Sequence, residues 1–107
     1  YDPVLNTFTE WPGTGLPLGI EPAYPYAEQS MPFAGAGQVL VLGTDGIWEA
    51  RDPAGEMYGK ARFREVVRRS AGLPAAGIVA AVLAELAAYR GEGRQEDDVT
   101  LVVVKRV

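Results

Sequence analysis

Two short apolar runs constrain the fold of this chain more than any other feature of its sequence. The first covers residues 37–43 and is bounded by Gly37 and Gly43, and the second covers residues 99–104. A continuous apolar run between glycines is typical of a strand that is buried on both faces. We therefore expect two buried β-strands over these residues.

Other segments show weaker periodicities around these two runs. Residues 59–71 place apolar side chains at helical spacing among arginines, and residues 74–90 repeat apolar side chains every three or four positions. Both patterns predict amphipathic helices. Upstream, alternation over residues 6–11 predicts a half-buried strand, and residues 24–33 are strand-like but contain two prolines, which indicate an edge strand or a bulge. A turn is predicted at residues 12–15.

The order of these elements indicates the fold class. The chain has 107 residues, which is enough for one domain and too few for two. Its predicted strands come early and its helices are grouped late, apart from a single helical turn expected over residues 47–51. This order favours an α+β fold over a regular βαβ alternation.

Composition removes most kinds of catalytic site. The chain contains no cysteine and no histidine, which excludes disulfides, thiol catalysis, Ser-His-Asp triads and His-ligated metals. A net charge of −4 argues against a nucleic-acid-binding domain, and the arginines of residues 62–69 fit a solvated helix face. No run reaches the roughly 18 apolar residues of a membrane span, and no signal peptide is in view, so we expect a cytoplasmic protein. The chemistry that remains is a hard cation held by carboxylates.

Acidic residues lie where one predicted strand ends and the other begins. Asp45 follows the first strand and precedes Gly46, while Asp97 and Asp98 directly precede the second strand. If the two strands are antiparallel neighbours, these residues share one edge of the sheet. Carboxylates at that edge could bind Mg²⁺ or Mn²⁺, and Gly46 would let the backbone approach the site closely.

An alternative is that these acids are ordinary turn residues. An Asp before a Gly often accepts a backbone N–H, and Asp98 could form an Asx turn that leads to Thr100. Carboxylates of Asp45 and Asp97 more than about 8 Å apart could not share one ion. Trp48 and Glu49 could shape the site, although core packing explains Trp48 equally well.

Four segments, taken together and in this order, resemble a known family. They are TGLPLGI (14–20), VLVLGTDGIWEAR (39–51), GEMYG (55–59) and EDDVTLVVV (96–104). The combination resembles the C-terminal half of the SpoIIE/RsbU-type branch of the metal-dependent (PPM, or type 2C) serine/threonine phosphatases.

The resemblance implies a fold, a site and a reaction. The fold is α+β, part of a four-layer αββα sandwich in which antiparallel sheets are flanked by helices. By motif match, Asp45 and Asp97 are ligands of a binuclear Mn²⁺ or Mg²⁺ site, with Asp98 and Gly46 as supporting neighbours or a further ligand. The implied reaction is hydrolysis of phosphoserine or phosphothreonine by a metal-activated water, without a phosphoenzyme. The implied substrate is a phosphorylated bacterial signalling protein, such as an anti-sigma-factor antagonist.

The resemblance also implies that part of the family's domain is missing. The family's first half supplies an early Asp that bridges both metals, an adjacent Gly and a further acidic motif. We therefore expect residues 1–107 to be the C-terminal portion of a phosphatase domain, with little or no activity alone. Half a sandwich would leave strand faces such as Val39–Leu42 uncovered, which could promote a dimer through the sheet or the helices. The alternative function is a non-catalytic pseudo-phosphatase module that binds proteins.

Overall fold

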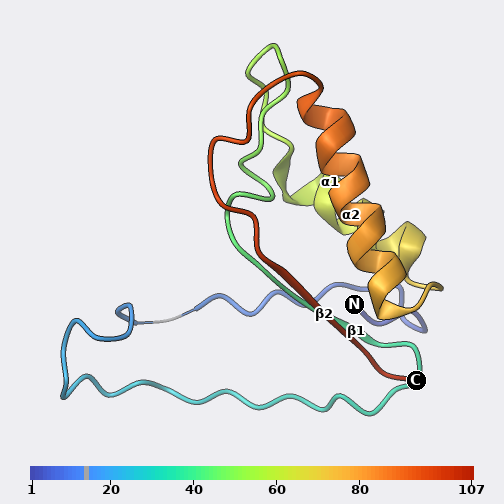
Figure 1. Ribbon diagram of the computed structural model, residues 1–107. Helices are drawn as coiled ribbons and strands as arrows, with labels where there is room; N and C mark the ends of the chain where they lie inside the picture. Colours follow the sequence, from blue (N-terminus) through green and yellow to red (C-terminus); the bar gives the residue numbers. More distant parts are fainter. Residues whose placement is uncertain (14) are drawn as a thin grey trace.

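Two strands and two helices form the framework of the protein (Figure 1). The computed structural model describes residues 1–13 and 15–107, with the elements β1 (Val39–Gly43), α1 (Gly59–Ser70), α2 (Ala75–Arg90) and β2 (Leu101–Lys105). β1 and β2 pair antiparallel, α2 packs against β2, and α1 packs against α2. The fold is therefore α+β, as predicted, and the two apolar runs are the two strands.

The two faces of this sheet have different environments. Register pairs Leu40 with Val104 and Leu42 with Val102, so these four side chains share one face. They are between 37% and 56% exposed, whereas Val39 on the opposite face is 2% exposed and belongs to the core. The prediction that both faces are buried is thus wrong for these residues, because helices cover only one of them. The expectation of an uncovered apolar strand face is confirmed.

The core lies between the helices and the covered face of the sheet. α2 contributes Ile78, Val82 and Leu86, all of them buried. Tyr58, directly before α1, is also buried and donates its hydroxyl proton to Glu85 Oε1 at 2.5 Å. Burial, followed by this hydrogen bond, raises the pKa of the Tyr58 hydroxyl, so the group remains a donor. α1 and α2 are thereby joined by both apolar packing and a hydrogen bond.

Both predicted helices are confirmed to within one or two residues at their ends. The arginines of α1 lie on its exposed side and form ion pairs with glutamates. Their partners are Glu10, Glu56, Glu65 and Glu85. Within the described residues, neither helix has the length and apolar character needed to cross a membrane.

The N-terminal segment contacts the sheet in a different way from the one predicted. Residues 6–11 form no strand, and the only pairing there is an antiparallel bridge between Asp2 and Thr7. Instead, the Tyr1 ammonium donates to the Val39 carbonyl oxygen at 2.7 Å, and the Val39 N–H donates to the Tyr1 carbonyl oxygen at 3.0 Å. The first residue, rather than residues 6–11, therefore extends the pairing of β1.

Two further expectations are corrected by the structure. Residues 24–33 form no strand, because Pro25 and Pro32 lack N–H donors, and most of the segment lies apart from the sheet (Figure 1). The single helical turn expected over residues 47–51 lies two residues earlier, over 45–49, where the Glu49 N–H donates to the Asp45 carbonyl oxygen. Thr14, part of the predicted turn and of the first family-like segment, lies outside the described residues.

A matched pair of leucine substitutions on α2 tests the placement of the core. Leu86 is 1% exposed and Leu83 is 45% exposed. Leu86→Ala should lower the free energy of unfolding by about 2–5 kcal/mol, because it leaves a cavity. Leu83→Ala should change it by only about 0.5 kcal/mol. Urea unfolding followed by circular dichroism measures both, and equal losses would contradict this packing.

Candidate metal centre

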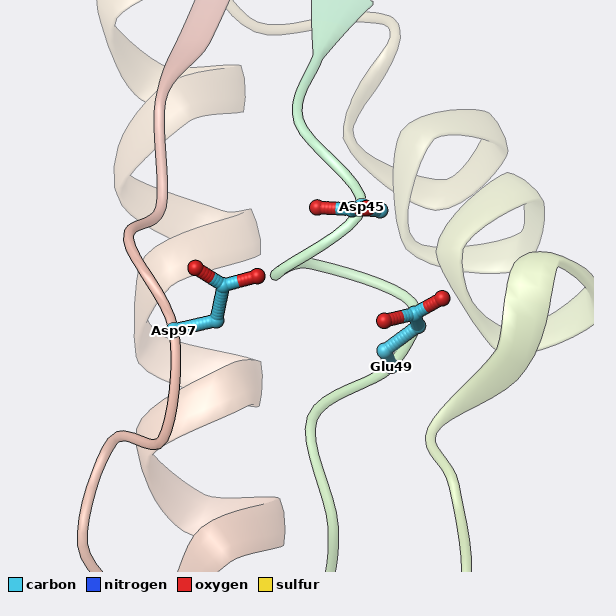
Figure 2. A group of neighbouring side chains, drawn as sticks. All are labelled: Asp45, Glu49 and Asp97. Carbon is cyan, nitrogen blue, oxygen red and sulfur yellow. The ribbon is translucent and has the colours of Figure 1, made fainter.

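Three carboxylates from two distant parts of the chain gather at one edge of the sheet. Asp45, Glu49 and Asp97 each offer one carboxylate oxygen, and these oxygens all lie within 4.8 Å of one another. Figure 2 shows the Asp97 side chain extending from the segment before β2 toward the turn that carries Asp45 and Glu49. All three residues are exposed. The structure therefore brings Asp45 and Asp97 together, well inside the 8 Å limit for sharing an ion.

The tight turn after β1 sets the positions of Asp45 and Glu49. The Ile47 N–H donates to the Thr44 carbonyl oxygen at 3.1 Å, and the Glu49 N–H donates to the Asp45 carbonyl oxygen at 2.9 Å. The second bond joins residues four apart, a spacing that places two side chains on the same side of a helical turn. Glu49 was predicted only to shape the site. The available signal was its position four residues after Asp45 in a turn-forming segment.

Thr44 joins the two strand ends that carry the acids. Its hydroxyl donates to the Asp98 carbonyl oxygen at 3.1 Å and accepts from the Thr100 N–H at 3.0 Å. Its own N–H donates to the Thr100 carbonyl oxygen at 3.1 Å. These three bonds continue the pairing of β1 and β2 beyond the last ladder residues. They hold the segment that contains Asp97 against the turn that contains Asp45.

Gly46 allows the two segments to approach each other closely. The residue is buried, and a Cβ at this position would overlap the Asp98 carbonyl oxygen and lie 3.5 Å from the Asp97 Cβ. Its φ angle is negative, so the need for glycine here is space rather than conformation. The predicted close approach at Gly46 is confirmed.

The turn-residue alternative does not explain the Asp45 side chain. Among the described residues, no backbone N–H donates to the Asp45 carboxylate, whereas Asp97 Oδ1 accepts the Asp98 N–H at 2.7 Å. The alternative of an Asx turn from Asp98 to Thr100 is not what the structure shows, because the Thr100 N–H donates to the Thr44 hydroxyl. Asp98 contributes to the site through its backbone carbonyl oxygen, which accepts the Thr44 hydroxyl. That Asp45, Asp97 and Asp98 bind or support a metal stays a prediction.

The donor set fits a hard divalent cation. All three groups are carboxylates, and metal–oxygen distances of about 2.0–2.6 Å allow two ligand oxygens of one ion to be up to about 5 Å apart. Mg²⁺ and Mn²⁺ prefer oxygen ligands and retain several waters, which suits exposed side chains. Trp48, by contrast, packs against the core and its ring lies 5.9 Å from that of Phe63, so its role is structural.

Substitution of Gly46 tests the contact between the turn and the Asp98 carbonyl. Gly46→Ala should lower the free energy of unfolding by about 1–3 kcal/mol, because the new methyl group forces the two segments apart. Gly72→Ala is the matched control, since Gly72 has open space around it and should change stability by no more than about 0.5 kcal/mol. Thermal unfolding measures both variants. A Gly46→Ala variant as stable as the control would contradict the contact.

Comparisons with known proteins identify the family and the fold of this chain. The family model described as Stage II sporulation protein E (SpoIIE) matches residues 4–107. The solved structure of the SiaA-PP2C domain of Pseudomonas aeruginosa is 31% identical, with a TM-score of 0.68, and the match covers 79% of this chain and 34% of that one. The chain thus spans about a third of the length of that structure. No curated protein sequence matches. Since the family match extends over nearly all of the sequence, the chain belongs to the SpoIIE family and is similar in fold to PP2C-type phosphatase domains.

Proposed function

We propose that this chain is the metal-binding C-terminal portion of a serine/threonine protein phosphatase domain. The domain would hydrolyse phosphoserine or phosphothreonine on a bacterial signalling protein, such as an anti-sigma-factor antagonist. The observation that carries the proposal is the meeting of Asp45, Glu49 and Asp97 within 4.8 Å at the joined ends of β1 and β2. Membership of the SpoIIE family supports the choice of a phosphatase over other metal-dependent hydrolases.

The three carboxylates have one task in this proposal, which is to hold Mn²⁺ or Mg²⁺. A bound divalent cation makes water a nucleophile at neutral pH and neutralises charge on the phosphoryl oxygens. Asp45 and Glu49 hold it from the turn after β1, and Asp97 holds it from the segment before β2. Thr44 and Gly46 keep those two segments in contact, so they preserve the spacing of the ligands.

The exposure of the cluster limits what this chain can do alone. Three solvent-exposed carboxylates, each offering one oxygen, leave about half of the coordination positions of an octahedral cation to water, and they repel one another when no cation is bound. Two metals would need further ligands. We therefore propose that residues 1–107 bind one cation weakly and hydrolyse phosphopeptides slowly or not at all, while the phosphatase domain that contains them is active.

Phosphate release by the phosphatase domain that contains this chain tests the proposal. With a phosphoserine peptide as substrate, activity should require Mn²⁺ or Mg²⁺ and should fall by at least about 100-fold in Asp45→Asn or Asp97→Asn, because each change removes a charged ligand. Glu92→Gln is the control, since Glu92 is exposed in the loop after α2 and lies outside the cluster.

The phosphatase activity of these variants distinguishes the two candidate functions, a phosphatase and a non-catalytic protein-binding module. Activity that needs the cation, collapses in both Asp variants and persists in Glu92→Gln supports the phosphatase. A folded domain that releases no phosphate with either cation refutes it and favours the non-catalytic protein-binding module.

A further inference from the structure

A small pocket lies beside the acidic cluster and shares part of its wall. The pocket has a volume of about 160 Å³, and its lining includes Gly46, Glu49 and Asp97. The pocket also contains positively charged side chains, and none of them belongs to α1. Three arginines line it: Arg51, Arg90 and Arg94.

These arginines differ from those of α1 in forming no ion pair with a carboxylate among the described residues. The chain has ten Lys and Arg side chains, and five of them, all on α1, form ion pairs with glutamates. Among the described residues, no ion pair involves Arg51, Arg90 or Arg94. A guanidinium carries five N–H donors in a planar fork that matches two oxygens of a phosphate. The pocket therefore concentrates three guanidinium groups that form no ion pair with a carboxylate among the described residues.

Separate parts of the fold bring the three arginines together. Arg51 belongs to a tight loop that is closed by its bridge to Met57, and its Nη1 donates to the Gly55 carbonyl oxygen at 2.6 Å. The Tyr89 hydroxyl donates to the Met57 carbonyl oxygen at 3.1 Å, which ties this loop to the end of α2. Arg90 is the last residue of α2, and Arg94 lies four residues further on in the loop toward β2. The three arginines therefore line one pocket because of contacts between separate segments, and not because of their spacing along one helix.

The charge of the pocket depends on the state of the neighbouring acids. Glu49, Glu96 and Asp97 also line it, so the three positive charges are balanced while the acids are free. When Glu49 and Asp97 hold a divalent cation, the balance shifts toward positive charge beside that cation. An anion should then bind more tightly, and by reciprocity the anion should strengthen cation binding.

We infer that Arg51, Arg90 and Arg94 form a binding site for the phosphate monoester dianion of a phosphorylated serine or threonine side chain. This inference deepens the proposed phosphatase function and rests on it for its place in a reaction. The arginines act as specificity-determining residues that contact the phosphoryl oxygens from the wall of the pocket. Binding itself needs no turnover and is measured separately.

The test is a titration of the full chain, in the presence of Mg²⁺, with three probes: a phosphoserine peptide, the same peptide without phosphate, and inorganic phosphate. NMR chemical shifts of the arginine side chains and of residues 90–97 report binding. Arg90→Gln and Arg94→Gln should each weaken binding of the phosphopeptide about tenfold, the effect of losing one charge-assisted contact. Arg106→Gln is the matched control, because Arg106 follows β2 at the other end of the sheet and does not line the pocket.

The outcomes separate this inference from the proposed function. The inference is supported by tighter binding of the phosphopeptide than of the plain peptide, weakened in Arg90→Gln and Arg94→Gln but not in Arg106→Gln. Equal binding of the two peptides, equal affinity of all variants, or binding of inorganic phosphate alone overturns it. Phosphopeptide binding at the arginines without hydrolysis by the complete domain would refute the phosphatase and leave the anion site. Hydrolysis by the complete domain that is unaffected by either arginine substitution would refute the anion site and leave the phosphatase.

Discussion

Antiparallel pairing of β1 with β2 is the constraint on which the rest of the structure depends. It brings Asp45 and Asp97, more than fifty positions apart in the sequence, to the same edge of the sheet. The helical hairpin α1–α2 occupies the chain between the strands, and α2 packs on β2. Thr44 then extends the pairing by three hydrogen bonds past the ladder. The proximity of the two acids therefore depends on this strand pairing.

The distribution of charge follows from the same framework. On α1, cations and glutamates neutralise each other in exposed ion pairs, which contribute little to stability and leave no strong field. At the edge of the sheet, by contrast, carboxylates and guanidinium groups lie near one another without forming ion pairs among the described residues. These carboxylates and guanidinium groups are not paired with one another in the described part of the chain, which suits a site that binds a cation and an anion together.

Much of this framework could be predicted from the sequence, because its signals are local. Two apolar runs, the first of them bounded by glycines, identified β1 and β2. Helical periodicity identified α1 and α2, and the position of Gly46 after Asp45 indicated a close backbone approach. The juxtaposition of Asp45 and Asp97 required only the added assumption of antiparallel neighbours.

The remaining features depend on tertiary contacts that leave no periodic signal. Residues 6–11 alternate like a strand, but Tyr1 occupies the backbone groups of Val39 that a partner strand would need. Leu40 and Leu42 resemble buried residues, yet their face of the sheet has no helix over it. Glu49 joins the acidic cluster because the turn after β1 is closed by the bond from its N–H to the Asp45 carbonyl oxygen. Each outcome was decided by what packs against the segment.

The central claim is that Asp45, Glu49 and Asp97 hold one divalent cation, and paramagnetic broadening by Mn²⁺ tests it most directly. Substoichiometric Mn²⁺ should first remove the backbone amide signals of residues 44–50 and 96–99 in the NMR spectrum of the chain, and Asp45→Asn should abolish this selectivity. Broadening that begins equally at exposed acids elsewhere, such as Glu21 and Glu28, or that persists unchanged in Asp45→Asn, would contradict the claim.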